Sequence, residues 1–269
     1  MLPIKMPDFV NVVAAGTALL EKIPLGPTYR RLILELGGTA FTKAMITRIL
    51  VKLNTKPIWD ITGSDLDTIN KYRGLYDEAT HLTLDFSEPR ARTIIGQEWG
   101  NIDTSKEAGI TGFSVEVTIA GATAPTLKAW AETGSPQPMD SPYKGLITAM
   151  LSQPYNAAAG SFTVPLPKGS DVGALIKRTY IFAANLTKAN VKRNGVNVFE
   201  EIEPAVNSFM QKEYQRAPQA NLFVIDNIID GNQSGSMPTR DANLEMRLTF
   251  SGAEVARLYG DLYIPLAAV

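Results

Sequence analysis

Carboxylates are the side chains of this sequence that are best suited to chemistry. The stretch "IDNIIDGNQSGSMPTRDANLE" (residues 225–245) holds Asp226, Asp230 and Asp241 among Asn, Gly and Ser residues. Carboxylate and amide oxygens are the ligands that calcium prefers, although this spacing departs from the EF-hand pattern. Two interpretations follow: a polar surface loop, which is favoured, and a structural Ca2+ site formed by these three carboxylates.

Nucleophilic catalysis and transition-metal chemistry find little support in the composition. The chain has no Cys and one His, which excludes thiolate nucleophiles, Cys/His zinc sites and iron–sulfur clusters. His81 begins a predicted strand on its polar face, so we interpret it as a surface residue. The "SPYK" of Ser141–Lys144 matches the S-x-x-K of serine acylases, but neither S-D-N nor K-T-G accompanies it. We predict no enzyme activity and no catalytic residue.

Two alternatives to a purely structural role remain open from the residue types. Trp59, Trp99 and Trp130 would suit a lectin-like carbohydrate-binding module of jelly-roll class if they were exposed together. A pair of carboxylates could serve a glycosidase, but no spacing singles out a pair. The lectin-like module is the runner-up interpretation, and the glycosidase is the weaker one.

The charge balance argues against a polyanionic partner. With 26 basic and 27 acidic residues, the net charge of -1 gives no long-range field to attract phosphate backbones, so direct sequence-specific nucleic-acid binding is not expected. The apolar run "FVNVVAAGTALL" is too short to span a membrane. We predict that residues 1–26 form an N-terminal arm or helix.

Most of the remaining chain shows the pattern of β-strands. Apolar and polar residues alternate strictly in "GFSVEVTI" (residues 112–119) and "NLEMRLTF" (residues 243–250), as is typical of half-buried antiparallel strands. Gly, Pro and Asn are frequent between such segments. The predicted fold class is therefore mainly all-β.

Two helices interrupt the strands. The first is predicted to begin at Ser64, whose hydroxyl would cap the Asp67 amide, and to end at Gly74. The second lies in "EEIEPAVNSFMQKEYQ" (residues 200–215), with Pro204 in its first turn. Each has an apolar stripe at helical spacing: Leu66, Ile69 and Tyr72 in the first, and Ile202, Val206, Phe209 and Met210 in the second.

The order of these elements repeats. The strand "MITRILVKL" (residues 45–53), the first helix and three further strands match the strand "RTYIFAANL" (residues 178–186), a basic turn "TKANVKRNG" (residues 187–195), the second helix and three further strands. A proline-rich connector lies between the halves. We predict an N-terminal arm at 1–26, a first domain at 27–137 and a second at 138–269, each the size of an eight-stranded jelly-roll sandwich with an inserted helix.

The sequence also resembles a known family. The stretch "YRRLILELGGTAFTKAMITRILVKLNTKPIWDITGSDLDTINKYRG" (residues 29–74), with the second half just described, is similar to the major capsid protein of corticoviruses, tailless icosahedral phages with an internal membrane. The resemblance covers essentially the whole chain. It rests on overall sequence character and not on a short diagnostic motif. It implies a double jelly roll, two tandem eight-stranded sandwiches, and a coat function without enzyme activity.

This resemblance implies partners and a place in the virion. Three chains would form a homotrimer of nearly hexagonal outline that tiles the shell, beside a vertex (penton) protein and membrane-associated virion proteins. The chain would be made in the cytoplasm of a bacterial host. Loops 87–111 and 227–242 would face outward or contact neighbours, and residues 1–27 would lie near the internal membrane. The family also implies calcium, for which Asp226, Asp230 and Asp241 are our candidate ligands.

Overall fold

The chain folds into two compact units, each with its own core. The structure is a computed structural model that describes residues 2–135, 145–168, 173–240 and 243–268. Unit 1 comprises Met1–Lys71, Leu75–Thr148 and Pro265–Val269, and unit 2 comprises Tyr72–Gly74 and Ala149–Ile264. The predicted domain boundary at Gln137 lies outside the described residues. None of the helices in the described ranges has the length and apolar character needed to span a bilayer.

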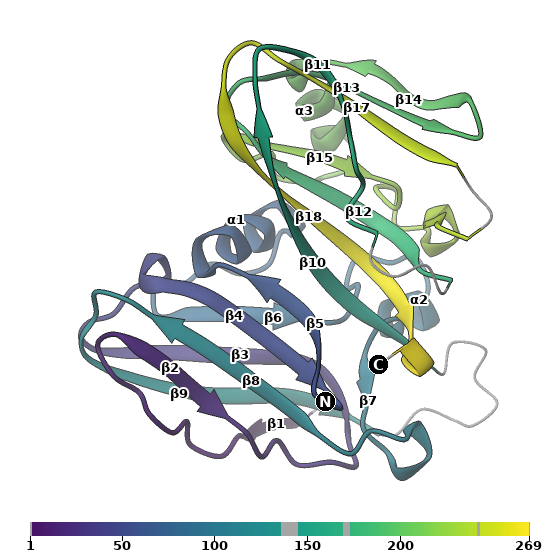
Figure 1. Ribbon diagram of the computed structural model, residues 1–269. Helices are drawn as coiled ribbons and strands as arrows, with labels where there is room; N and C mark the ends of the chain where they lie inside the picture. Colours follow the sequence, from purple (N-terminus) through teal and green to yellow (C-terminus); the bar gives the residue numbers. More distant parts are fainter. Residues whose placement is uncertain (1, 136–144, 169–172, 241–242, 269) are drawn as a thin grey trace. The chain divides into compact units, whose positions relative to one another are not determined.

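Unit 1 is a sandwich of two antiparallel sheets (Figure 1). One sheet has the order β1 (Leu2–Lys5), β9 (Thr123–Gly134), β3 (Thr28–Ala40) and β6 (His81–Asp85), and the short β7 (Ile102–Asp103) also pairs with β3. The other has the order β2 (Gly16–Leu20), β8 (Phe113–Ile119), β4 (Ile46–Leu53) and β5 (Lys56–Ile61). Helix α1 (Gly63–Arg73) follows β5, and α2 (Ile94–Glu98) follows β6.

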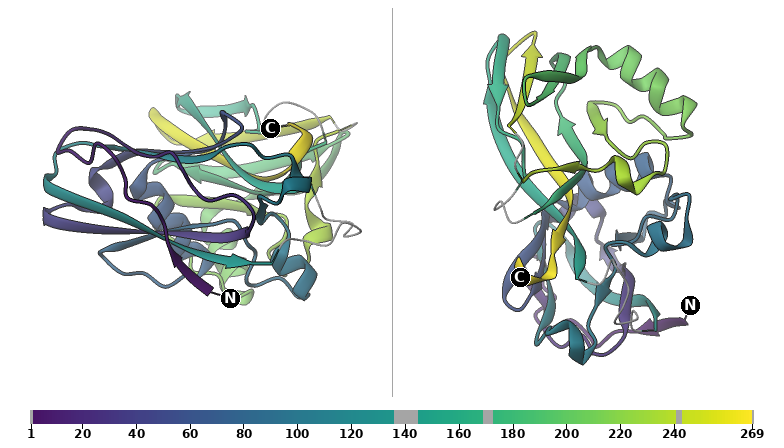
Figure 2. Two further views of the ribbon diagram at one scale, coloured as in Figure 1. Left: turned by 90° about the horizontal axis from the view of Figure 1, so that it is seen from below. Right: turned by 90° about the vertical axis from the view of Figure 1, so that its right-hand side faces the viewer.

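Unit 2 is a second sandwich of the same kind. One sheet has the order β10 (Leu146–Ala157), β18 (Glu254–Pro265), β12 (Leu175–Phe182) and β15 (Leu222–Asp226), and β16 (Met237–Pro238) also pairs with β12. The other has the order β11 (Gly160–Val164), β17 (Leu244–Phe250), β13 (Leu186–Arg193) and β14 (Val196–Ile202). Helix α3 (Pro204–Glu213) follows β14 and lies outside the strands (Figure 2). Short 3-10 helices span Lys43–Met45, Lys106–Ala108, Gln233–Gly235 and Leu266–Ala268.

The two units share one topology. When the eight longer strands of each unit are numbered in chain order, their sheets read 1-8-3-6 and 2-7-4-5 in both units. A helix follows the fifth strand in each unit, and a two-residue strand pairs with the third. This is the jelly-roll arrangement, so the predicted fold of two tandem eight-stranded jelly rolls, each with an inserted helix, is confirmed.

The predicted correspondence between the halves was wrong by one strand. The strand order matches β4 to β13, whereas β12, which contains most of "RTYIFAANL", matches β3. Most of the predicted basic turn is the strand β13, in which Ala189 and Val191 are buried while Lys188 and Lys192 lie on the other face. The turn itself is confined to Asn194 and Gly195, which both have positive φ.

Residues 1–26 were predicted to form an arm or a helix, and the helix is wrong, because residues of this segment pair with both sheets of unit 1. Leu2–Lys5 pairs with Thr133–Trp130 of β9, and Gly16–Leu20 pairs with Ile119–Val115 of β8. Asn11 has a φ of 58°, which no right-handed helix contains, and its side-chain amide donates to the Thr17 carbonyl at 2.9 Å. The segment is therefore part of the sandwich.

Helix α1 begins two residues earlier than a cap at Ser64 predicts. The Thr62 hydroxyl accepts the Asp65 amide at 3.1 Å, so Thr62 is the N-cap and Ser64 lies inside the helix. Leu66 and Ile69 are buried as predicted. Gly74 has a φ of 74°, which fits its predicted role as the residue that ends the helix.

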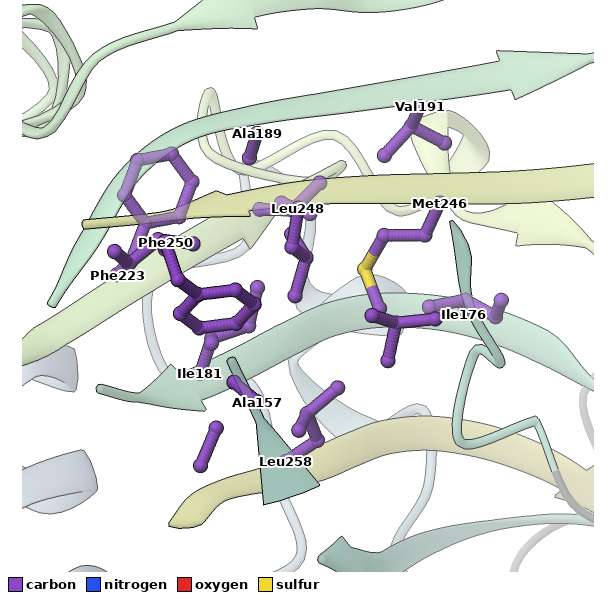
Figure 3. Packing of buried hydrophobic residues seen from close by; sticks show 14 of the residues in the cluster. Ala157, Ile176, Ile181, Ala189, Val191, Phe223, Met246, Leu248, Phe250 and Leu258 are labelled. Carbon is purple, nitrogen blue, oxygen red and sulfur yellow. The ribbon is translucent and has the colours of Figure 1, made fainter. Parts of the chain in front are cut away.

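Each sandwich is held together by side chains that point inward from both sheets. In unit 2, Ile181 and Leu258 of one sheet face Met246 and Leu248 of the other (Figure 3). In unit 1, the Tyr29 and Phe113 rings meet edge to face, with centroids 5.2 Å apart. The strand β8 alternates buried and half-buried residues along its whole length, as its sequence predicts.

Candidate assembly surfaces

The three predicted calcium ligands do not form a common site in the described part of the chain. The carboxylate of Asp226 is buried, and Arg178 Nε donates to it at 3.0 Å while Arg216 Nε lies 3.7 Å away. Asp230 accepts the backbone amide of Asn232 at 3.0 Å, and Asp241 lies outside the described residues. Within the described ranges, no group of three or more His, Asp or Glu side chains is placed to hold a metal ion. The carboxylate of Asp226 is thus placed against two arginine side chains.

The tryptophans do not form a shared platform. Trp59 is buried, and its indole N–H donates to the Thr148 carbonyl at 3.0 Å. Trp130 is about one-third exposed on β9 and donates to Glu35 at 2.8 Å, and this bond, with Lys128 beside it, lowers the pKa of Glu35. A sugar-binding surface of three exposed tryptophans is therefore not present, and the lectin-like alternative is not supported.

His81 lies at the surface, as its position on the polar face of a strand predicts. His81 is exposed at the start of β6, and its Nδ1 lies 3.0 Å from the hydroxyl of Thr80. It lines an open hollow of about 420 Å3 together with Arg31, Ile33, Leu75, Tyr76, Glu78 and Thr83. Arg31 is engaged by Asp85 and Glu132. The S-x-x-K match at Ser141–Lys144 lies outside the described residues.

Helix α3 presents its apolar side to solvent. Asn207 and Gln211 are buried on the side that packs against the sandwich, and Asn207 Nδ2 donates to the Val224 carbonyl at 3.1 Å. The exposed large apolar side chains are Val206, Phe209, Met210 and, just past the helix, Tyr214. Three residues of the predicted stripe therefore share a face of the helix, whereas Ile202 is the last residue of β14 and packs against the core of unit 2. The stripe faces outward, because helical period shows which residues share a face and not what covers that face.

A second exposed apolar site lies in unit 1. Helix α2 places Ile94 and Ile95 at the surface, where Ile94 is 77% exposed. The Thr93 hydroxyl accepts the Gly96 amide at 3.0 Å, which fixes the start of this short helix. Arg90 and Arg92, just before it, are also exposed. These residues lie in the loop 87–111, which is predicted to face outward or to contact neighbours.

Exposed apolar groups of this kind indicate association with other proteins and not catalysis. Two family models cover nearly the whole chain. Residues 3–134 match the viral coat protein P2 N-terminal domain, and residues 147–264 match the viral coat protein P2 C-terminal domain. Comparison with curated proteins found no match.

Solved structures share the fold of the whole chain. The major capsid protein P2 from bacteriophage PM2 is 19% identical, with a TM-score of 0.87 over 97% of this chain and 96% of that one. The STIV major capsid protein is 12% identical, with a TM-score of 0.71 over 98% and 96% of the two chains. The PBCV-1 virus capsid is 11% identical, with a TM-score of 0.65 over 97% and 92%. The chain thus belongs to the viral coat protein P2 family, a family of structural proteins and not of enzymes, and is a component of the virion capsid.

Proposed function

We propose that this chain is the major capsid protein of its virion and that it acts as a homotrimer. The observation that carries the proposal is the duplicated jelly roll, in which the two units repeat one strand order through both sheets. Three chains with two similar sandwiches each supply six similar building blocks around a threefold axis. Such a trimer has a nearly hexagonal outline and tiles an icosahedral shell through similar contacts on all sides.

The work of the protein in this role is interfacial. Apolar side chains hold each sandwich together, while exposed apolar and charged surfaces hold chains to one another. The partners are first of all other copies of this chain, in the same trimer and in neighbouring ones. A vertex (penton) protein and membrane-associated virion proteins complete the proposed set, in a shell around an internal membrane that is assembled in a bacterial host.

Contact of residues 1–26 with that membrane stays a prediction. Strands β1 and β2 tie this segment to the sandwich, and the connection between them is one part of it that is available for a lipid surface. Val10 and Val13 are exposed in this connection. Cosedimentation of the protein with vesicles, compared with a Val10→Ser/Val13→Ser variant, tests the contact, and equal pelleting of both proteins would contradict it.

Stabilisation by calcium also stays a prediction. Asp226 is engaged by arginine and Asp230 accepts the Asn232 amide, while Asp241 lies outside the described residues. We keep Asp230 and Asp241 as the candidate ligands. Calcium takes six to eight oxygen ligands, so two carboxylates of one chain leave most positions to carbonyls, waters or a neighbouring chain. A site completed at the contact between copies would make calcium part of assembly.

Negative-stain electron microscopy of the purified full-length protein tests the proposed function. Class averages are expected to show particles with threefold symmetry and six peripheral densities, two from each chain. Averages that show particles with only two densities would contradict the trimer. Labelling of purified virions with an antibody to this chain then tests its abundance, since a major capsid protein is labelled over the whole shell and not at the vertices alone.

A further inference from the structure

The outer face of α3, which we define as Val206, Phe209, Met210 and Tyr214, is the feature of the fold that most needs a partner. These residues stand at positions i, i+3, i+4 and i+8 and so share one side of the helix. Phe209 is 63% exposed, whereas the polar Asn207 on the opposite side is 5% exposed. A surface helix of an isolated sandwich normally has the reverse arrangement, with its apolar side on the core.

The duplicated topology supplies an internal comparison. Helix α1 follows the fifth strand of unit 1, as α3 follows the fifth strand of unit 2. The apolar stripe of α1 is covered, since Leu66 and Ile69 are no more than 1% exposed. Helices that follow the same strand in the two units therefore differ, since the stripe of α1 is covered and that of α3 is exposed. The apolar residues of α3 are placed where a second molecule can cover them.

The charges around this face define what can cover it. Glu203 precedes the first turn of α3, and Glu213 ends the helix next to Lys212, so an acidic group stands at each end of the apolar stripe and one cation stands at its C-terminal end. Glu200 and Glu201 of β14 lie just before the helix and are exposed; Glu200 accepts a hydrogen bond from Asn197, and Glu201 pairs with Lys188 at 3.4 Å. A complementary surface therefore needs apolar side chains bordered by cations.

The same chain carries such a surface in unit 1. The isoleucine surface, which we define as Arg90, Arg92, Ile94 and Ile95, combines two exposed apolar side chains with two exposed arginine residues. Its isoleucines are apolar, like the stripe of α3. Its arginines carry the charge opposite to that of the glutamates at the ends of the stripe. One chain thus contains both halves of a possible contact, on different units.

We propose that the outer face of α3 binds the isoleucine surface of a second copy of this chain. This inference rests on the proposed trimer and names its contact. A contact between two different surfaces is heterologous, so each copy gives one surface and receives the other, and a ring closes when every copy is engaged on both sides. Three copies bury three such contacts, which leaves no outer face of α3 uncovered.

Substitution of the apolar residues tests the contact directly. Val206→Ser/Phe209→Ser in the full-length protein is expected to raise the protein concentration at which trimers dissociate by about tenfold or more, the effect of losing a central apolar anchor. The matched control is Val255→Ser, which removes an apolar side chain of unit 2 that is 62% exposed and lies on β18. Light scattering over a dilution series gives the dissociation, and thermal unfolding of each variant shows whether it is folded.

Charge reversal identifies the partner surface. Glu200→Lys/Glu203→Lys and Arg90→Glu/Arg92→Glu are each expected to weaken the trimer, and the combination of all four substitutions is expected to recover at least part of the loss. If the folded variants dissociate at the same dilution as the wild-type trimer, the inference is overturned. The proposed trimer itself is not contradicted by that result. Weakening without recovery in the combined variant would overturn the pairing of these two surfaces. A wild-type protein that is monomeric throughout would overturn both proposals.

Discussion

Arg178 of β12 donates one hydrogen bond to Asp226 of β15 and another to Asp261 of β18, each at 3.0 Å. The three residues are register partners across neighbouring strands, and all three side chains are at most 2% exposed. Lys177 adds a further cation, with its Nζ 2.7 Å from Asp261 Oδ1 and 4.5 Å from the centre of the Tyr263 ring. One guanidinium therefore ties three strands of unit 2 together in the interior of a sheet.

Removal of this guanidinium is expected to destabilise unit 2. Arg178→Met leaves two buried carboxylates without their shared partner, and breaking a buried pair in this way costs about 3–5 kcal/mol of unfolding free energy. The control is Arg48→Met, which breaks the largely exposed pair with Asp60 and is expected to cost about 1 kcal/mol or less. Urea unfolding followed by circular dichroism measures both, and equal midpoints for the two variants would contradict the role of the cluster.

Gly260 of β18 marks a close approach of two backbone segments. A Cβ at this position would lie 2.0 Å from the carbonyl oxygen of Pro167, so the backbone itself must shift to admit one. Gly260→Ala is expected to destabilise the protein by about 3 kcal/mol or more, at the upper end of overpacking costs. Gly112→Ala serves as the control, because a Cβ there meets no atom within 4 Å. Comparable losses of thermal stability in both variants would argue against the close approach.

Stability at alkaline pH is expected to depend on Tyr29. Burial raises the pKa of Tyr29 to about 12, and its hydroxyl donates to the Pro24 carbonyl at 2.5 Å. Below pH 10 the phenol is neutral in both the folded and the unfolded chain, so it causes no pH dependence. Above pH 10 it ionises only in the unfolded chain, which favours unfolding by about 1.4 kcal/mol per pH unit until the folded pKa is reached.

The variant Tyr29→Phe lacks this ionisation and isolates its effect. Its unfolding free energy is expected to fall by about 2 kcal/mol less than that of the wild-type protein between pH 10 and 12. At pH 7 it is expected to be about 1 kcal/mol less stable, because the hydrogen bond to Pro24 is lost. Tyr76→Phe is the control, since the Tyr76 side chain is 88% exposed. The interpretation fails if both variants show the same alkaline slope.

Calcium, if it completes a site at a contact between copies, should affect assembly and not the folding of one chain. EDTA is then expected to lower the thermal stability of the assembled protein, and Asp230→Asn is expected to abolish this effect of EDTA. Asp226→Asn, by contrast, should destabilise the protein with and without calcium, because the Asp226 carboxylate is the ion-pair partner of the buried Arg178. Identical melting curves and masses in calcium and in EDTA would contradict a role of calcium in assembly.

Strand alternation predicted the interior of the sandwiches well. Phe113, Val115 and Val117 are buried where their spacing places them, because a period of two leaves one face for the core and one for the surface. The prediction failed where strands were short or carried charge. The strand Leu2–Lys5 is too short to show an alternating pattern. The strand β13 was predicted as a turn because of its lysines, although its other face is buried.

The assembly surfaces were harder to predict than the fold. Sequence spacing identified Val206 and Phe209 as one stripe of α3, but their direction depends on Asn207 and Gln211, whose burial only the folded unit defines. Asp226 was a calcium candidate by its position in a polar loop, whereas the register of β12 and β15 places it against Arg178. In both cases the deciding contacts join residues that are distant in sequence.

The mass of the wild-type protein in solution tests the central claim most directly. The single chain has a mass of 29.2 kDa, so a compact trimer has about three times that mass, near 88 kDa. Light scattering on the purified full-length protein is expected to give this value, with one species that persists on dilution to low micromolar concentration. A single species of 29.2 kDa over the same range would contradict the trimeric capsid protein on which the account depends.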